Sequence, residues 1–595
     1  MTVGRGRLSQ AWLVGLLALA VVGLQPPPAQ ALDRAVAKGD PAGCAYIHDP
    51  DEPMTLSRDG TLILPPVNIA WQLPDNPTWR EDPFTSKAWR IRYQSLRYVH
   101  SLFNDWCATG DDAVLDRAEF LLRDWHQDNP IGAAAPYAWY DHPVSWRTVV
   151  LVRGAGLMPD QPWLHDAIEL HASYLVDNYG GVGNHALNEN LGLLAASCFI
   201  GRQDWIDIAE RRINKLLERS VSPEGVSNEQ AIAYQEYNYR LYTKARADLL
   251  ACGRPEPALF SRVLLMPEML AHATLPNGQY EMLGNTKRQT AASFLGTHTV
   301  FTASQGAAGS PPPSTVAVYK AGFAFARTGW GETTPYNDEV MMTLRYGPGR
   351  AMHGHDDGGA VTLYGFGSRL LLDPGKNSWH NRTETWPVWV ASRAAHNVVT
   401  VDGLAYRSST TTYQSNSVSP QALHMQLSNS GYTGVTNVRS VLFSRLGGYV
   451  IVDDRLTADQ PRTFRQLWHL NQDARPAVAA SRVRTRSSRG NLEIRQLMGA
   501  HNTRVLTGST DPLQGWLTYD YQTVIAAPVV EQIKVGTSAR YLTLLVPFDD
   551  MPTVSTRVLQ QWSDGYKVEV TVNGLTERIK VRGGTVIVNT VTDGT

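Results

Sequence analysis

Cysteine is scarce in this sequence. The 595 residues include four cysteines, Cys44, Cys107, Cys198 and Cys252, all in the N-terminal half. No two of them have the C-x-x-C spacing, which argues against a zinc site built from cysteines. Four cysteines allow three disulfide pairings, and the sequence does not choose among them. Cys198 stands in the apolar run LGLLAASCF, which predicts a buried thiol.

A strong net charge is also missing. The 54 Lys and Arg residues are balanced by 55 Asp and Glu, so the formal net charge is -1. This balance argues against a nucleic-acid partner, which would be held by a basic surface. A local basic groove for an anionic sugar is compatible with a neutral total. Candidates for such a groove are Lys287, Arg288, Arg345 and Arg350.

Long apolar runs are absent beyond the first residues. Arg5 and Arg7 precede an apolar run over residues 11–24, and residues 29–31 (Ala-Gln-Ala) have the small-x-small form of a cleavage site. The run is shorter than the roughly 20 residues of a membrane span. We therefore predict a signal peptide at residues 1–31 and no membrane span after its cleavage. The mature protein, beginning near Leu32, is expected to be secreted or periplasmic.

Helical periodicity dominates the first half of the chain. From about Lys87 to Leu270, six segments carry apolar residues at helical spacing, separated by short breaks with Gly, Pro and Asp. Helices paired in series suit an α/α toroid or a helical solenoid. Without a strict sequence repeat, periodicity alone does not choose between these two folds. We assign the helical domain to residues 32–305.

The composition changes at residues 306–315, which are rich in Gly, Ser and Pro and predict a linker. Beyond them, alternating and β-branched segments such as NVVTVDG and YLTLLVPF predict antiparallel strands. We assign a β-sandwich to residues 316–500 and a smaller β-sheet region to residues 501–595. The predicted class is a multidomain α+β protein, with helices first and sheets second.

The densest group of reactive side chains lies in this β region. Residues 350–375 read RAMHGHDDGGAVTLYGFGSRLLLDPG, with two histidines and two aspartates in one turn and an Asp-Pro-Gly at the end. Residues 392–403, SRAAHNVVTVDG, follow. Imidazoles and carboxylates at the ends of adjacent strands can form a metal site or a proton-transfer site.

A second polar group belongs to the helical half. The residues Gly-Asn-His at 183–185 open the helical segment ALNENLGLLAAS, and the loop SPEGVSNE at 222–229 leads into Tyr-Gln-Glu-Tyr at 234–237. An asparagine at a helix start is an ordinary N-cap. A tyrosine in a helical pattern is usually a packing residue. Neither residue type by itself indicates a function.

Taken in order, these motifs resemble the heparinase II/III-like polysaccharide lyases. The most specific are the HGHDD turn with its later DPG, the H-N segment that runs into V-D-G, GGYVIVDDRL and RQLWHL. The Asn-His and Tyr elements of the helical half are weaker. The resemblance spans nearly all of the mature chain. It implies an N-terminal α/α toroid followed by a C-terminal antiparallel β-sandwich.

The resemblance further implies β-elimination on a uronic acid. In that reaction the C5 proton, next to a carboxylate, is removed and the glycosidic oxygen at C4 leaves. A hydrogen-bond donor or cation at the carboxylate stabilises the enolate-like charge. A base takes the C5 proton and an acid protonates the leaving oxygen.

The resemblance assigns these roles to residues of this chain. Asn184, with help from His185, would grip the uronate carboxylate. Tyr234 matches the tyrosine that serves as acid, and for some substrates as base. His353 matches a histidine that serves as base or assists in neutralising the carboxylate. Glu229 and Arg393 are implied to bind or orient the substrate.

One departure from the family pattern leaves the choice of tyrosine open. Several members have a histidine after the tyrosine, whereas this chain has Gln235. Tyr237 and Tyr239 are close enough in sequence to be alternatives to Tyr234.

The remaining histidines form a second candidate site. Two imidazoles and a carboxylate, His355, Asp373 and His396, suit zinc or another divalent metal. In some family members the matching positions hold a structural metal. The alternative is a pair of hydrogen-bonded structural histidines. No organic cofactor is predicted.

The expected partner is an anionic polysaccharide. Glycosaminoglycans such as heparan sulfate, hyaluronan or chondroitin are the leading class, and alginate is second. A different interpretation is a glycoside hydrolase on an α/α toroid, with an acid and base drawn from Glu224, Glu229 and Glu236. A third is a carbohydrate-binding protein without catalysis.

Overall fold

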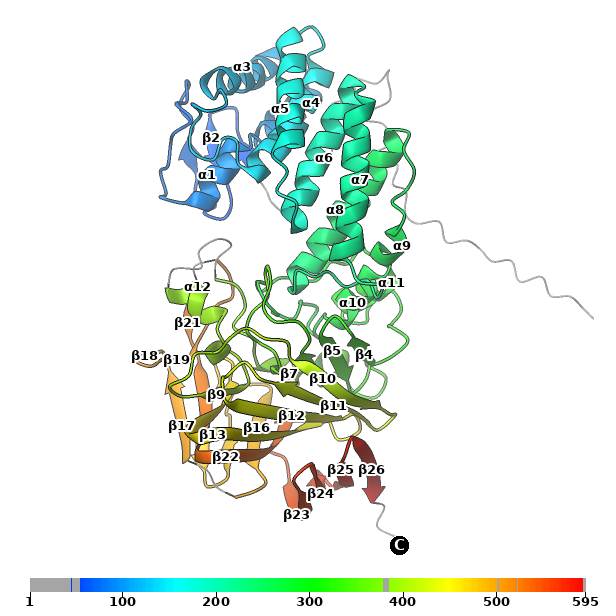
Figure 1. Ribbon diagram of the computed structural model, residues 1–595, viewed down its shortest axis with the longest axis vertical. Helices are drawn as coiled ribbons and strands as arrows, with labels where there is room; N and C mark the ends of the chain where they lie inside the picture. The colour runs from blue at the N-terminus through cyan, green and yellow to red at the C-terminus, as the bar shows by residue number, and fades with distance from the viewer. Residues whose placement is uncertain (1–43, 45–53, 378–384, 500–501, 522, 592–595) are drawn as a thin grey trace, which may run out of the picture.

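The computed structural model describes residue 44 and residues 54–377, 385–499, 502–521 and 523–591. Helices fill its N-terminal part and antiparallel sheets its C-terminal part, as predicted (Figure 1). The predicted signal peptide, residues 1–31, lies outside the described residues. Among the helices of the described ranges, none combines the length and apolar character that a membrane span requires.

The N-terminal part opens with a small sheet of β1 (Thr55–Leu56), β2 (Thr61–Ile63) and β3 (Trp71–Gln72). The helices that follow are α1 (Lys87–Gln94), α2 (Val99–Thr109), α3 (Asp112–Asp128), α4 (Asp141–Leu157), α5 (Pro162–Asp177), α6 (Gly183–Ile200), α7 (Gln203–Ser220), α8 (Ile232–Ala251), α9 (Phe260–Val263), α10 (Met266–His272) and α11 (Thr297–Ala303). α7 buries residues at helical spacing, including Ile206, Ala209 and Ile213, as an amphipathic helix does.

The contact between α4 and α6 is unusually close. A Cβ atom at Gly192 of α6 would lie 2.7 Å from the carbonyl oxygen of Ser145 in α4. Only a glycine permits this approach of two backbones. It aligns the beginnings of the two helices, so that Asp141 of α4 meets His185 of α6.

All four cysteines form disulfides, Cys44–Cys107 and Cys198–Cys252. The prediction of a buried thiol at Cys198 is therefore wrong. An apolar run indicates burial, but a disulfide is as compatible with an apolar environment as a thiol is. Cys252 reaches Cys198 because the end of α8 lies beside α6.

The C-terminal part is built from three sheets. The five-stranded sheet runs in sequence order through β4 (Val316–Tyr319), β5 (Phe323–Arg327), β6 (Met341–Arg345), β7 (Val361–Gly365) and β8 (Ser368–Leu371). The ten-stranded sheet contains β9 (Val399–Val401), β10 (Thr412–Val418), β11 (Ala422–Asn429), β12 (Val435–Ser444), β13 (Tyr449–His469), β14 (Ala477–Ala479), β15 (Arg482–Arg484), β16 (Asn491–Gln496), β17 (Asn502–Thr507) and β22 (Pro528–Phe548). The four-stranded sheet is β23 (Val554–Trp562), β24 (Gly565–Val572), β25 (Leu575–Arg582) and β26 (Thr585–Val591).

Smaller elements join these sheets. They are the 3-10 turns η1 (Tyr336–Asp338) and η2 (Arg393–Ala395), helix α12 (Thr385–Val390), and two short strand pairs, β18 (Ser509–Thr510) with β19 (Leu513–Gln514) and β20 (Trp516–Leu517) with β21 (Ile525–Ala526).

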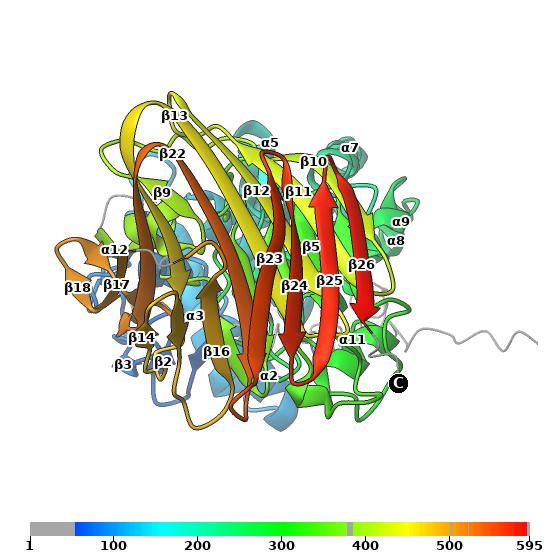
Figure 2. The same ribbon diagram turned by 90° about the horizontal axis from the view of Figure 1, so that it is seen from below.

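The three sheets are stacked in layers. The five- and ten-stranded sheets share a core that includes Ala324 and Phe443, which makes the β-sandwich. The four-stranded sheet covers the other face of the ten-stranded sheet through residues such as Ile451 and Val568 (Figure 2). The outer face of the five-stranded sheet packs against α10 and its neighbours, with Phe323 in contact. Strand β5 is therefore buried on both faces, and its apolar residues do not alternate with polar ones.

The predicted boundary at residue 500 falls inside the ten-stranded sheet. β17 pairs with β22, and β22 pairs with β13 along nearly its whole length. The separate sheet begins at Val554. Strand pairing over such a distance in the chain leaves no local signal, so composition could not locate this division.

Candidate active site

A cleft of about 550 Å³ lies where the helical region meets the sandwich. Its walls come from α1, α4, α6 and α8, from residues 287–294, and from two positions in the β region. All four residues predicted to be catalytic line it: Asn184, His185, Tyr234 and His353. They come from two helices and one loop of the sandwich, so the tertiary fold alone brings them together.

Asn184 is held by a buried carboxylate. Its backbone N–H and its side-chain Nδ2 each donate to Glu229, at 2.8 Å to Oε1 and 2.8 Å to Oε2. Burial raises the pKa of Glu229, and hydrogen bonds from Asn238 and Asn184 oppose that rise. These two hydrogen bonds to Glu229 fix the Asn184 amide at the start of α6. The helix dipole favours an anion at this position.

Tyr234 and His353 form a stacked pair. Their ring centroids are 3.5 Å apart and their planes are 7° from parallel. Tyr234 stands in the first turn of α8, and His353 lies in the loop between β6 and β7. His353 Nε2 is 3.3 Å from Oε2 of Glu229, so one carboxylate contacts both Asn184 and His353. The two rings therefore enter the cleft with fixed orientations.

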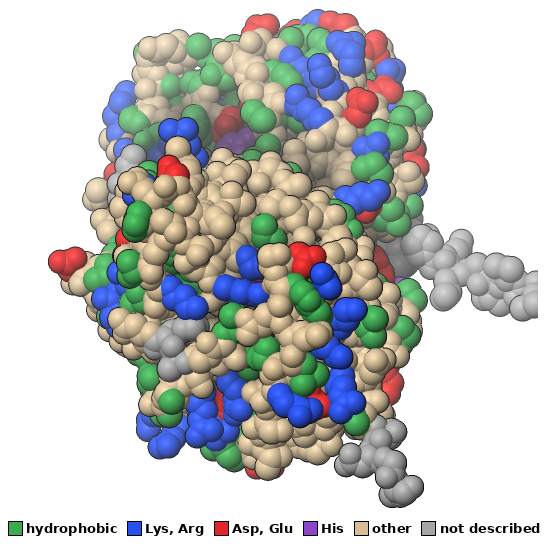
Figure 3. Space-filling model, turned by 60° about the horizontal axis from the view of Figure 1, so that its bottom comes forward, with side chains coloured by type: hydrophobic (Ala, Val, Ile, Leu, Met, Phe, Trp, Pro, Cys, Tyr) green, Lys and Arg blue, Asp and Glu red, His purple; other side chains and the backbone are tan. Residues whose placement is uncertain are grey.

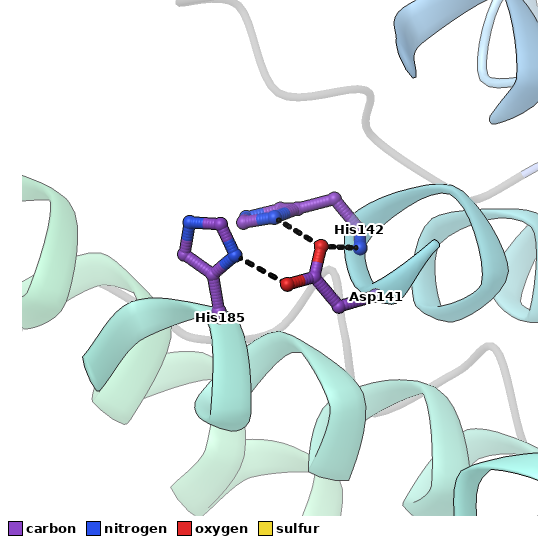
Figure 4. Close-up of side chains that lie close together, drawn as sticks. All are labelled: Asp141, His142 and His185. Atoms are coloured by element: carbon purple, nitrogen blue, oxygen red, sulfur yellow. Dashed lines mark hydrogen bonds and ion pairs between the residues drawn. The ribbon is translucent and has the colours of Figure 1, made fainter. Parts of the chain in front are cut away.

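A third arrangement involves Asp141, which sequence analysis missed. Nδ1 of His185 is 2.7 Å from one carboxylate oxygen and Nδ1 of His142 is 3.3 Å from the other (Figure 4). The two imidazole rings meet edge to face, with centroids 3.8 Å apart. Burial would raise the pKa of Asp141, but hydrogen bonds from His142 and His185 lower it below its ordinary value. An ionised Asp141 favours the Nδ1–H tautomer on both rings, which leaves each Nε2 as the basic nitrogen. The adjacent Asp-His pair at 141–142 was the available sequence signal.

The three predicted metal ligands do come together. His355, Asp373 and His396 are buried, and their ligand atoms lie within 4.8 Å of one another. Nδ1 of His355 is 3.3 Å from Nε2 of His396, and each nitrogen is within 3.8 Å of the Asp373 carboxylate. Burial raises the pKa of Asp373 to about 7 and lowers that of His355 to about 4.

The outer nitrogens of these two rings show that the residues fit a metal. Nε2 of His355 is 3.1 Å from Oδ1 of Asn285, and Nδ1 of His396 is 2.8 Å from the backbone oxygen of Ser392. Both contacts place the ring proton on the outer nitrogen. The inner nitrogens, Nδ1 of His355 and Nε2 of His396, therefore direct their lone pairs toward each other beside the Asp373 carboxylate. Oδ2 of Asp373 is buried without a hydrogen-bond partner. A divalent cation would satisfy all three groups.

Asn285, also missed by sequence analysis, connects this group to the cleft. Its Oδ1 faces His355, its Nδ2 lies 3.4 Å from Nδ1 of His353, and its backbone N–H donates to the His353 oxygen at 2.9 Å. A Cβ at the preceding residue, Gly284, would lie 2.7 Å from the same oxygen. Nothing local in the sequence marks this asparagine.

Comparison with known proteins identifies the β part of the chain. Residues 311–539 match the family described as heparinase II/III-like, C-terminal. No relative was found among the curated proteins by sequence.

Solved structures share the fold of nearly the whole chain. The chain is similar to a mutant heparan sulfate lyase HepC from Pedobacter heparinus, with a TM-score of 0.71, 19% identity and 93% of each chain covered. It is also similar to a heparinase III, with a TM-score of 0.73 and 16% identity, covering 98% of this chain and 94% of the other. The predicted toroid followed by a β-sandwich is confirmed, and the predicted enzyme class, polysaccharide lyase, is that of the family.

The two predicted substrate-binding residues are not among the side chains that line the cleft. Glu229 is 1% exposed and lies behind Asn184 and His353. Arg393 is 4% exposed and donates to the Gly358 oxygen at 2.9 Å. The contacts of these two residues are with structure around the cleft: Glu229 accepts from Asn184, and Arg393 joins η2 to the loop before β7.

The predicted basic groove is only partly present. Of its four candidates, Lys287 lines the cleft. Arg345 is buried beside Asp357 at 3.3 Å, Arg350 lies 3.6 Å from Asp356, and the Arg288 guanidinium lies over the Tyr519 ring. The other cations that line the cleft are Arg92, Arg240 and Lys376, and the carboxylate among the described lining residues is Glu236. The cleft is therefore cationic although the chain is nearly neutral.

The geometry also separates the three tyrosines. Tyr234 and Tyr237 line the cleft, and the Tyr237 hydroxyl accepts from Nδ2 of Asn188 at 3.1 Å. Tyr239 packs against the helical core away from the cleft. Tyr234 is the one stacked on His353.

Proposed function

We propose that this protein is an exported polysaccharide lyase that cleaves a uronate-containing glycosaminoglycan by β-elimination. The observation that carries the proposal is the meeting of Asn184, Tyr234 and His353 in one cationic cleft. An amide donor, a phenol and an imidazole at one site match the three tasks of the reaction: holding a carboxylate, moving a proton to the leaving oxygen and removing the C5 proton.

The carboxylate of the uronate would sit at the start of α6. Glu229 holds one N–H of the Asn184 amide group and leaves its second N–H for the substrate. His185, oriented by Asp141, stands next to it in the cleft. Donors at this position stabilise the charge that develops as C5 loses its proton.

Proton transfer would fall to the stacked pair. Tyr234 supplies a phenol to the glycosidic oxygen, or takes the C5 proton when the stereochemistry requires it. His353 serves as base or shares in neutralising the carboxylate. The stacking holds both rings within one cleft wall, which fixes their distance to the sugar.

A divalent metal, most suitably zinc, would be held by His355, Asp373 and His396. When bound, it supplies a fixed positive charge behind the cleft. Asn285 joins these three residues to His353. The proposed metal site would therefore affect the reaction by holding the His353 loop in place.

Glycosaminoglycan is favoured over alginate for two reasons. The cleft is lined by Arg92, Lys287 and Lys376, and by Arg240, which pairs with Glu236, so its positive charge exceeds that of one uronate carboxylate. Solved structures with the same fold are described as a heparan sulfate lyase and a heparinase III.

The hydrolase alternative lacks its pair of acids. Glu229 is buried, and Glu224 accepts from the Lys320 backbone at 2.8 Å away from the cleft-lining side chains. Glu236 lines the cleft but accepts from Nε of Arg240 at 2.9 Å. Three glutamates so placed do not face one another across a sugar.

Export is supported by two features. The first 31 residues have the pattern of a signal peptide. The two disulfides are typical of proteins that mature in an oxidising compartment.

The test is ultraviolet absorbance of the 4,5-unsaturated uronate, using the mature chain with heparan sulfate, hyaluronan, chondroitin sulfate and alginate. We expect absorbance to rise on a glycosaminoglycan and the rise to be lost in Tyr234→Phe. Tyr239→Phe, which removes a hydroxyl away from the cleft, is the matched control. New reducing ends without absorbance would indicate a hydrolase and contradict the proposal.

A further inference from the structure

The four-stranded sheet β23–β26 lies at the end of the molecule away from the helices (Figure 1). Its inner face packs on the ten-stranded sheet through Tyr566, Val570 and Ile579, among others. It begins at Val554, beyond the last residue of the family match at 539. Its outer face is available to a partner, and the chemistry of the cleft does not use it.

Strand register places charged residues in rows across that outer face. Gln560, Lys567, Lys580 and Ile587 face one another across the four strands. The next row holds Arg557, Glu569, Arg578 and Asn589. Five cations define what we call the basic face. They are Arg557, Lys567, Arg578, Lys580 and, opposite Gly565, Arg582.

The positive charge of the basic face is only partly neutralised. Glu569 pairs with Arg557 at 3.0 Å and with Arg578 at 2.6 Å, and Asp564 lies 3.8 Å from Arg582. Lys567 and Lys580 stand directly opposite each other on β24 and β25. Neither forms an ion pair with the described residues. Like charges in opposite positions destabilise a sheet. Figure 3 shows this end of the molecule, where Lys and Arg outnumber Asp and Glu.

An aromatic ring lies within the basic face. Trp562 stands opposite Gly565, and Gly565 stands opposite Arg582. The Arg582 guanidinium lies 4.7 Å from the Trp562 ring centroid, and the Lys580 ammonium lies 5.9 Å from it. The indole therefore lies beside two cations of the basic face. A flat ring beside cations suits a sugar that carries acidic groups.

We propose that the basic face binds an anionic polysaccharide chain at a site separate from the cleft. Sulfates or carboxylates would pair with Lys567, Lys580 and Arg582, and a sugar ring would lie against Trp562. The proposal rests on the proposed function only for the identity of the polymer. A polymer held there has a raised effective concentration at the cleft, so long chains benefit and short ones do not.

The test measures binding and turnover separately in the full chain. Binding of fluorescently labelled heparan sulfate is measured by anisotropy in the Tyr234→Phe background, with labelled neutral dextran as reference. Lys567→Ala/Lys580→Ala is compared with Arg211→Ala/Lys215→Ala, which removes two exposed cations from α7. Trp562→Ala is the third variant, and thermal unfolding verifies the fold of each.

We expect the basic-face double variant to bind heparan sulfate about fivefold more weakly, since each exposed ion contact contributes modestly. Trp562→Ala should also weaken binding, and the α7 variant should match the parent. With Tyr234 restored, the double variant should lose kcat/KM on the polymer and retain it on a tetrasaccharide.

Equal losses in the basic-face and α7 variants would reduce the effect to net charge and overturn the proposal. If the basic-face substitutions weakened binding of duplex DNA more than binding of heparan sulfate, the proposal would be overturned in favour of a nucleic-acid ligand. Unchanged binding together with normal cleavage would refute polysaccharide binding at the basic face and leave the proposed lyase activity standing. Reduced binding of the variants, with no cleavage by the parent protein, would refute the proposed lyase activity and support polysaccharide binding at the basic face.

Discussion

At the scale of single residues, the cleft depends on side chains that hold other side chains. Asp141 orients His142 and His185, and Glu229 fixes the Asn184 amide. Asn285 stands between His353 and His355. Each holder lies outside the set of cleft-lining side chains, so its loss should change the rate of the reaction more than the shape of the cleft.

Asp141→Asn should lower turnover of the polymer by about 10²-fold, the lower range for loss of a positioned proton-transfer group. The amide removes the charge that holds both Nδ1–H tautomers and places an N–H against one ring. Steady-state absorbance kinetics measure the change. Asp166→Asn, at an exposed position of α5, is the control. Equal rates for the two variants would show that Asp141 has no such role.

Asn285→Ala should reduce the affinity of the proposed metal site and the activity, each by about 10- to 100-fold, as expected for an outer partner of a proposed histidine ligand. Its Oδ1 holds the outer nitrogen of His355, and its Nδ2 contacts His353. Elemental analysis of the purified protein and absorbance kinetics give the two readouts. If metal content fell while activity stayed normal, the connection to His353 would be refuted.

At the scale of elements, the packing of α6 on α4 sets the position of the helical half of the cleft. The two helices begin with Gly183 and Asp141, and the close approach at Gly192 keeps those beginnings together. The start of α8 brings Tyr234 beside them. The beginnings of three helices therefore form one wall of the cleft.

Gly192→Ala should lower the free energy of unfolding by about 1–3 kcal/mol, since the new methyl group would lie 2.7 Å from the Ser145 oxygen. The separation of α4 and α6 should also weaken the Asp141–His185 contact and reduce activity. Gly156→Ala is the matched control, because a Cβ in that part of α4 meets nothing within 4 Å. Denaturant unfolding compares the two, and equal stability would contradict the prediction.

At the scale of the whole molecule, the candidate cleft lies where the helical and β parts meet. Asn184 and Tyr234 belong to helices, and His353 belongs to a sandwich loop. The contact between α10 and the five-stranded sheet, with Phe323 and Leu270 in its core, holds the parts together. Stability of the sandwich is therefore a condition for activity.

The sandwich should lose stability in mild acid. Burial lowers the pKa of His424 to about 4, whereas its ordinary value is 6.5. The folded state then binds fewer protons than the unfolded state between these values, so stability falls as pH falls through that window. From pH 7 to pH 5 the loss is about 2 kcal/mol from this residue. His424→Leu should flatten the pH dependence of the free energy of unfolding, and an unchanged slope would show that His424 does not titrate this way.

The sequence by itself determined the order of helices and sheets, the sandwich motifs and the types of residue at the site. These follow from periodicity and from short motifs such as HGHDD and DPG, which are local properties of the chain. It also indicated His355, Asp373 and His396 as one group, and the structure brings them together.

The tertiary structure alone decided which residues meet. Asn285 became recognisable only by its contacts with histidines of a distant segment, and the contact of Asp141 with His185 joins two helices. Glu229 and Arg393 proved to lie outside the cleft lining. The Cys198–Cys252 disulfide and the single sheet that crosses residue 500 were equally hidden. The physical reason is the same in each case: contacts between residues far apart in sequence depend on how helices and strands pack, and packing leaves no local pattern in the chain.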